Sequence, residues 1–123
     1  MAKVLLIGAG GVAGVAAAKM AQNPDVFGEL LIASRTKARC DAIEADIKKR
    51  GFGKAGKKTV ITTAQIDAMD VAATTAMIKD YKPDLVMNIA LPYQDLTIME
   101  ACLACGVHYV DSANYEPEDT EEP

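Results

Sequence analysis

The sequence predicts an α/β fold in which helices cover both faces of a doubly wound parallel sheet. Short apolar segments alternate along the chain with longer segments whose apolar residues recur at helical spacing. Turn residues separate these segments, and no internal repeat interrupts the alternation. Strands that alternate with helices form parallel sheets, because a helical crossover returns the chain to the same edge. We expect the strand order 3-2-1-4-5, with ligands at the carboxyl ends of the strands.

Five short segments have the composition of strands. The first is a continuous apolar run that leads directly into glycines, and the third is rich in β-branched residues. The expected strands cover residues 4–7, 30–33, 59–63, 85–90 and 107–110. Residues 51–58, which hold three glycines and three lysines, are expected to form a loop.

Four longer segments have the composition of helices. They cover residues 11–21, 36–50, 71 to about 81 and 95–105. A glycine or proline follows each of them, in the order Pro24, Gly51, Pro83 and Gly106. Asp70 stands immediately before the third segment, where an aspartate side chain can bind free backbone N–H groups. We therefore interpret Asp70 as a helix cap.

The acidic charge of the chain is concentrated in its last residues. The net charge is −4, yet residues 115–123 hold five of the 17 acids, and the other 12 acids face 13 lysines and arginines. Bulk charge therefore gives no indication of nucleic-acid binding. Length and composition predict one domain over residues 1–114, followed by an acidic tail or linker at 115–123. No apolar run reaches the roughly 18 residues of a membrane span, so we expect a soluble, cytoplasmic protein.

Three cysteines are an odd number for a chain that is expected to be cytoplasmic, so a disulfide framework is not predicted. Cys102 and Cys105 match the CxxC spacing, but they lie inside an apolar helical pattern. Residues three apart share one helix face. We therefore expect two buried thiols and not a redox pair.

The glycine-rich sequence GAGGVAG at residues 8–14 is the strongest functional motif. It follows an expected strand and opens an expected helix, which is the context of a dinucleotide-binding Rossmann fold. Gly8 permits a tight turn, Gly10 lets the backbone approach a pyrophosphate, and Ala13 is small enough for close packing of the helix. Gly11 and Val12 begin the helix, whose free N–H groups bind phosphate. The alternative is a glycine turn with a structural role alone.

The end of the second expected strand predicts the cofactor. An NAD site has an acidic residue there, whereas this chain has Ser34, Arg35 and Thr36, with no acid before Asp41. Arg35 can form a charge-assisted contact with a 2′-phosphate, and the two hydroxyls can add donors. The sequence therefore predicts NADP(H). The alternative is that Arg35 is a solvated loop residue and Thr36 only a helix cap.

Two further segments follow strands that should border the cofactor. Asp67 and Ala68 come after the third expected strand and could lie against the adenine. Asn88 leads into Ala90, Leu91 and Pro92 at the end of the fourth strand, where the nicotinamide half should lie. Asn88 could equally be a structural polar group at a strand end.

No catalytic constellation stands out, so the catalytic residues stay unassigned. His108 is the one histidine and stands at the start of an expected strand, which favours a structural role. No histidine, cysteine and acid cluster has metal-ligand spacing, so no metal is predicted. A short-chain dehydrogenase would need a Tyr-xxx-Lys pair, and no tyrosine here has a lysine four residues later.

Three segments together resemble the NADP-binding domain of the saccharopine dehydrogenase (reductase) family. They are GAGGVAG at 8–14, ASRT at 33–36, and the late segment IMEACLACGVHYVD at 98–111. The resemblance extends to about Tyr115, and the family often has a third glycine where this chain has Ala13. Residues 21–28 resemble most closely the branch of the family that joins a diamine to aspartate semialdehyde.

The resemblance implies an oxidoreductase that uses NADPH to reduce an imine formed from an amine and an aldehyde. It also implies a following substrate-binding domain, which this chain lacks, and a homodimeric full-length protein. We therefore expect the 123 residues to be the cofactor-binding part of a longer enzyme and inactive alone. The alternative is a stand-alone nucleotide-binding or regulatory module without turnover.

Overall fold

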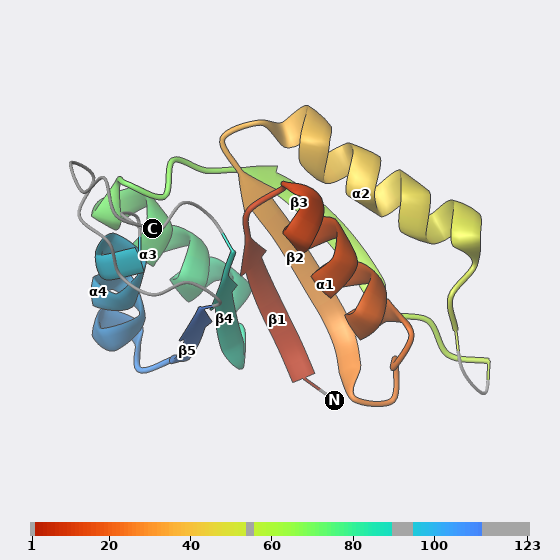
Figure 1. The fold of residues 1–123 in the computed structure, drawn as a ribbon. Helices are drawn as coiled ribbons and strands as arrows, with labels where there is room; N and C mark the ends of the chain where they lie inside the picture. The colour runs from red at the N-terminus through yellow and green to blue at the C-terminus, as the bar shows by residue number, and fades with distance from the viewer. Residues whose placement is uncertain (1, 54–55, 90–94, 112–123) are drawn as a thin grey trace, which may run out of the picture.

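The computed structural model describes residues 2–53, 56–89 and 95–111, which form a five-stranded parallel sheet covered by helices (Figure 1). The strands are β1 (Ala2–Ile7), β2 (Phe27–Ser34), β3 (Val60–Gln65), β4 (Leu85–Asn88) and β5 (His108–Asp111). Their order is β3-β2-β1-β4-β5, so the predicted α/β class and strand order are confirmed. The chain winds from β1 toward one edge and from β4 toward the other. The switch point between β1 and β4 is where doubly wound sheets bind their ligands.

Two helices cover each face of the sheet. Helices α1 (Gly11–Ala21) and α2 (Lys37–Arg50) lie on one face, and α3 (Val71–Tyr81) and α4 (Asp95–Cys105) lie on the other (Figure 1). All four begin within one residue of the predicted start. Helix α2 begins at Lys37, since Thr36 has extended backbone geometry and is the residue that precedes the helix.

Strand β1 is buried on both sides, as a central parallel strand should be. Val4 and Leu6 belong to the core formed with α1 and α2, whereas Leu5 and Ile7 belong to the core formed with α3 and α4. Each of these four residues is at most 1% exposed. This burial anchors β1, so the loop that follows the strand lies at the carboxyl edge of the sheet.

Four strands, β1, β2, β3 and β5, extend beyond the residues predicted for them, whereas β4 ends at Asn88 and not at residue 90 as predicted. Strand β2 begins at Phe27 and β3 continues to Gln65. Pairing accounts for both extensions, because Glu29 pairs with Val60 and Ser34 pairs with Gln65 in a parallel register. Backbone hydrogen bonds do not require apolar side chains, so the polar end of β3 carried no strand signal in the sequence.

The predicted helix boundaries have identifiable capping contacts. The Asp70 carboxylate accepts a hydrogen bond from the Ala73 N–H at 3.0 Å, which confirms its capping role. Gly51 has φ of 68°, and its N–H donates to the Ile47 carbonyl at 3.1 Å. Glycine adopts this left-handed conformation without the steric cost that other residues have.

The cysteines are free thiols. Cys102 is buried, as predicted, and burial raises the pKa of its thiol to about 11. Cys105 is only half-buried, and its Sγ lies 3.8 Å from the Thr75 carbonyl oxygen of α3. None of the described helices is long and apolar enough to cross a membrane. The predicted tail and the domain boundary after residue 114 lie outside the described residues.

Candidate cofactor-binding site

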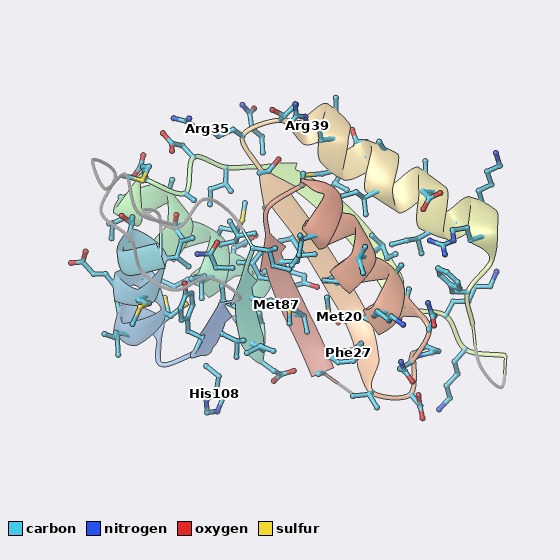
Figure 2. The ribbon with its side chains drawn as sticks, in the orientation of Figure 1. Met20, Phe27, Arg35, Arg39, Met87 and His108 are labelled. Atoms are coloured by element: carbon cyan, nitrogen blue, oxygen red, sulfur yellow. The ribbon has the colours of Figure 1, made fainter. Side chains whose placement is uncertain are left out.

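The sequence-predicted site residues that the structure describes gather at the carboxyl edge of the sheet. The loop after β1, the turn after β2 and the loop after β3 end side by side there, because their strands are neighbours. Figure 2 shows Arg35 and Arg39 at this edge and His108 at the opposite end of the molecule. His108 is exposed at the start of β5, so a role in chemistry at the cofactor edge is not supported.

The glycine loop has the geometry of a phosphate cradle. Gly8 has φ of 130°, and its N–H donates to the Ala33 carbonyl at 2.9 Å, so the loop turns sharply beside β2. A Cβ atom on Gly10 or Gly11 would meet no other atom within 4 Å, so the space outside their backbone is open. A side chain at Gly10 would occupy the space that a pyrophosphate needs.

Helix α1 directs its first N–H groups toward this space. The first backbone bond of the helix joins the Gly14 N–H to the Gly10 carbonyl at 3.1 Å. The N–H groups of Gly11, Val12 and Ala13 precede that bond and have no partner inside the helix. Ala13 is 0% exposed and packs in the core, whereas Val12 is 62% exposed. The residues present therefore fit a bound pyrophosphate at this helix end.

Ser34 shapes the turn after β2. Its hydroxyl accepts a hydrogen bond from the Thr36 N–H and donates to the Thr36 carbonyl, both at 3.1 Å. The Sγ of buried Cys40 lies 3.3 Å from the same hydroxyl. Thr36 is exposed, and its side chain makes no capping hydrogen bond to α2. The hydroxyl that stays available to a ligand is therefore that of Thr36.

Arg35 lies in the turn after β2, and its side chain contacts the loop after β3. Its Nε is 3.7 Å from Asp67 Oδ1, and both side chains are largely exposed. The Asp67 Oδ1 also accepts a hydrogen bond from the Met69 N–H at 3.0 Å. Gln65 Nε2 donates to the Arg35 carbonyl at 3.2 Å. Ala68 is 4% exposed, so Asp67 presents a side chain at this edge while Ala68 belongs to the core.

Asp41 is the first acid after the turn, and it faces β3. Its carboxylate accepts hydrogen bonds from the Thr63 hydroxyl and from Lys37 Nζ, the latter at 3.1 Å. The Thr63 hydrogen bond and then Lys37 lower the pKa of Asp41 below its ordinary value. Asp41 therefore has protein partners and does not take the place of the missing ribose carboxylate.

Arg39 is a second cation at this edge that the sequence interpretation missed. The Arg39 side chain is exposed in the first turn of α2, and the backbone N–H of Arg39 donates to the Thr36 carbonyl at 3.1 Å. Arg39 lines a groove of about 450 Å³ together with Gly10 and Gly11. No ion pair involves it among the described side chains. The sequence could have indicated Arg39, because it stands four residues after Arg35 in the first turn of a predicted helix.

Asn88 ends β4 beside the glycine loop. It pairs with Ile7 in the sheet register and is 2% exposed. Its Nδ2 donates to the Tyr109 hydroxyl of β5 at 3.0 Å. This contact gives Asn88 a structural role, whereas a contact with nicotinamide stays a prediction. Ala90, Leu91 and Pro92 lie outside the described residues. Within the described ranges, no group of three or more histidine, cysteine and acidic residues could hold a metal.

Comparison with known proteins identifies the family of the chain. Residues 4–122 match the saccharopine dehydrogenase NADP binding domain family. Carboxyaminopropylagmatine dehydrogenase from Synechocystis sp. is 50% identical over 119 residues, which cover 97% of this chain and 27% of that protein. Carboxynorspermidine synthase from Vibrio alginolyticus is 44% identical over 110 residues, which cover 89% of this chain and 26% of that protein. The chain thus spans about a quarter of the length of these curated relatives.

The fold has a solved counterpart in the same family. The structure of saccharopine dehydrogenase (L-Glu forming) from Saccharomyces cerevisiae superposes with a TM-score of 0.71 at 19% identity, over 95% of this chain and 23% of that one. At that identity the likeness concerns the fold alone. The sequence match to the family is what confirms the predicted resemblance and the predicted cofactor. The chain belongs to the saccharopine dehydrogenase family as an NADP-binding Rossmann domain.

Proposed function

We propose that this chain is the cofactor-binding part of an NADPH-dependent oxidoreductase that reduces an imine formed from an amine and an aldehyde. The single observation that carries the cofactor assignment in this proposal is the convergence of the glycine loop and the Ser34–Thr36 turn at one edge of the sheet. The names of the two curated relatives, a dehydrogenase and a synthase of carboxylated polyamines, support this substrate class.

The strand order arranges the cofactor subsites in sequence. Adjacent strands lie about 4.8 Å apart, so the ends of β2, β1 and β4 form a row along the edge. In this proposal Arg35 and Thr36 bind the 2′-phosphate after β2, and the Gly10–Ala13 segment binds the pyrophosphate after β1. The nicotinamide then lies near the end of β4, beside Asn88.

The protein's part in such a reaction is binding and orientation. When bound, NADPH supplies the hydride that adds to the carbon of the C=N bond, while a proton adds to the nitrogen and a secondary amine results. The Gly10–Ala13 segment would hold the pyrophosphate, and Arg35 and Thr36 would hold the 2′-phosphate, at the carboxyl edge of the sheet. Substrate binding and proton delivery are assigned, in this proposal, to a further domain of a longer, homodimeric protein.

A chimeric enzyme tests the proposal. This chain would replace the matching segment of the Vibrio alginolyticus relative, and NADPH consumption would be followed by absorbance. We expect consumption only when aspartate semialdehyde and a diamine are both present, and no turnover by the 123-residue chain alone. Equal consumption with the aldehyde alone would contradict imine reduction. Turnover by the isolated chain would contradict the assignment of substrate binding to another domain.

A further inference from the structure

We propose that Asp67 competes with the 2′-phosphate of the cofactor for Arg35, and so limits how tightly NADPH is held. The inference rests on the proposed role of Arg35 in binding that phosphate. Asp67 would then set the affinity for NADPH by repelling the 2′-phosphate. The sequence pattern alone places Asp67 only near the adenine.

Backbone contacts hold both partners of this pair. The Asp67 carboxylate is fixed by the Met69 N–H, 3.0 Å from Oδ1. The backbone of Arg35 is fixed by the Gln65 amide, which donates to its carbonyl at 3.2 Å. The 3.7 Å contact between Arg35 Nε and Asp67 Oδ1 therefore joins two anchored loops. A phosphate bound by the guanidinium would lie within a few ångströms of this carboxylate.

The balance of two effects decides the direction. An exposed ion pair contributes little to orientation, and the side chains of Arg35 and Asp67 are 69% and 51% exposed. Repulsion between the carboxylate and a phosphate of nearly two negative charges acts within the Debye length of about 8 Å at physiological salt. Removing the charge of Asp67 relieves this repulsion, and the relief exceeds the cost of orienting Arg35 less well. Neutralising Asp67 should strengthen NADPH binding.

The substitution Asp67→Asn isolates the charge, because an amide oxygen can still accept the hydrogen bond from the Met69 N–H. Dissociation constants of NADPH and NADH would be measured by titration calorimetry for the wild-type chain, Asp67→Asn, Arg35→Ala and the double variant. We expect Asp67→Asn to tighten NADPH binding about threefold, the scale of one exposed charge interaction, and to leave NADH nearly unchanged. The gain should be smaller in the Arg35→Ala background and at high salt.

Asp70→Asn is the matched control. Asp70 lies in the same loop, and asparagine caps a helix as well as aspartate does. Its NADPH affinity should change less than that of Asp67→Asn. Weaker NADPH binding by Asp67→Asn would overturn the competition and would mean that Asp67 orients Arg35. Unchanged NADPH binding, or an equal change for NADPH and NADH, would overturn the competition as well. If Arg35→Ala weakens the binding of NADPH and NADH equally, Arg35 does not bind the 2′-phosphate and the proposed cofactor site is wrong. That result is distinguishable from a failure of the competition alone, in which Arg35→Ala still weakens NADPH binding more.

Discussion

The hydroxyl of Ser34 and the backbone of Thr36 form a closed pair of hydrogen bonds, each 3.1 Å long. The pair engages the one hydrogen of the hydroxyl, so Ser34 shapes the turn, and its contact with a 2′-phosphate stays a prediction. The sequence predicts the Ser34 hydroxyl as a donor to the 2′-phosphate. The structure shows that Arg35 and Thr36 are the exposed members of this turn.

Cofactor preference is the most direct consequence of the turn. We expect NADPH to bind at least about tenfold more tightly than NADH, because a hydrogen bond to a charged group contributes roughly 1.5–3 kcal/mol. Arg35→Ala should weaken NADPH binding much more than NADH binding, and added salt should narrow the difference. Dissociation constants for both cofactors would measure this. Equal losses for both would mean that Arg35 only packs or stacks.

The preference should be reversible at two positions. In Ser34→Asp combined with Arg35→Ala, the new carboxylate can still accept from the Thr36 N–H, so the turn should survive. It would repel a 2′-phosphate and accept hydrogen bonds from a free ribose hydroxyl. NADH should then bind more tightly than NADPH in a fluorescence titration. Ser34→Ala with Arg35→Ala is the control, which should lose the NADPH preference without gaining NADH affinity. A retained preference for NADPH in the Ser34→Asp double variant would contradict the assignment.

Arg39 should contribute to NADPH binding as a second cation. Arg39→Ala should weaken NADPH binding by about threefold to tenfold and NADH binding less, since one exposed charge contact is lost. Arg50→Ala is the control, because Arg50 lines the same groove but pairs with Asp46 at 3.5 Å and lies over the Phe52 ring. If both arginine variants behave alike, Arg39 has no specific role at the phosphate.

Two glycines of the loop should respond differently to substitution. Gly10→Val places a side chain in open space, so the fold should survive while cofactor binding is lost. Gly8→Ala should lower stability by about 1–3 kcal/mol, because an L-residue at this positive φ is strained. Thermal unfolding and cofactor titration of both variants would test this. Unchanged affinity in Gly10→Val would show that the loop is not the phosphate site.

Asp41 provides a test of the contact between α2 and β3. Thr63→Val removes the hydroxyl that contributes most to lowering the Asp41 pKa, so that pKa should rise toward its ordinary value of 3.8. A carboxyl with a lowered folded-state pKa stabilises the fold above its unfolded-state pKa, and this contribution is lost as pH falls through the folded-state pKa. The variant should therefore show a weaker loss of stability below pH 4. NMR titration of Asp41 measures the shift, with Thr62→Val as the control. An unchanged pKa in Thr63→Val would contradict the stated cause.

Local sequence patterns were enough to predict the alternation of strands and helices, the glycine loop and the cationic turn after β2. These features depend on local composition: buried parallel strands are continuously apolar, and a phosphate-binding turn needs glycines at fixed spacing. The Asp70 cap was equally local, because its partner Ala73 is three residues away. Local patterns of this kind are visible in a single sequence.

The predicted strand order placed the site residues at one edge, but the side-chain contacts between them are visible only in the folded protein. Arg35 and Asp67 are far apart in the chain, and they meet because β2 and β3 run parallel in one register. Asp41 and Thr63 are also far apart, and they meet because α2 packs against β3. Adjacent strands bring their ends to within about 5 Å at one edge, whatever the length of chain between them. No local pattern encodes that proximity, so the partner of Arg35 could be found only once the sheet was assembled.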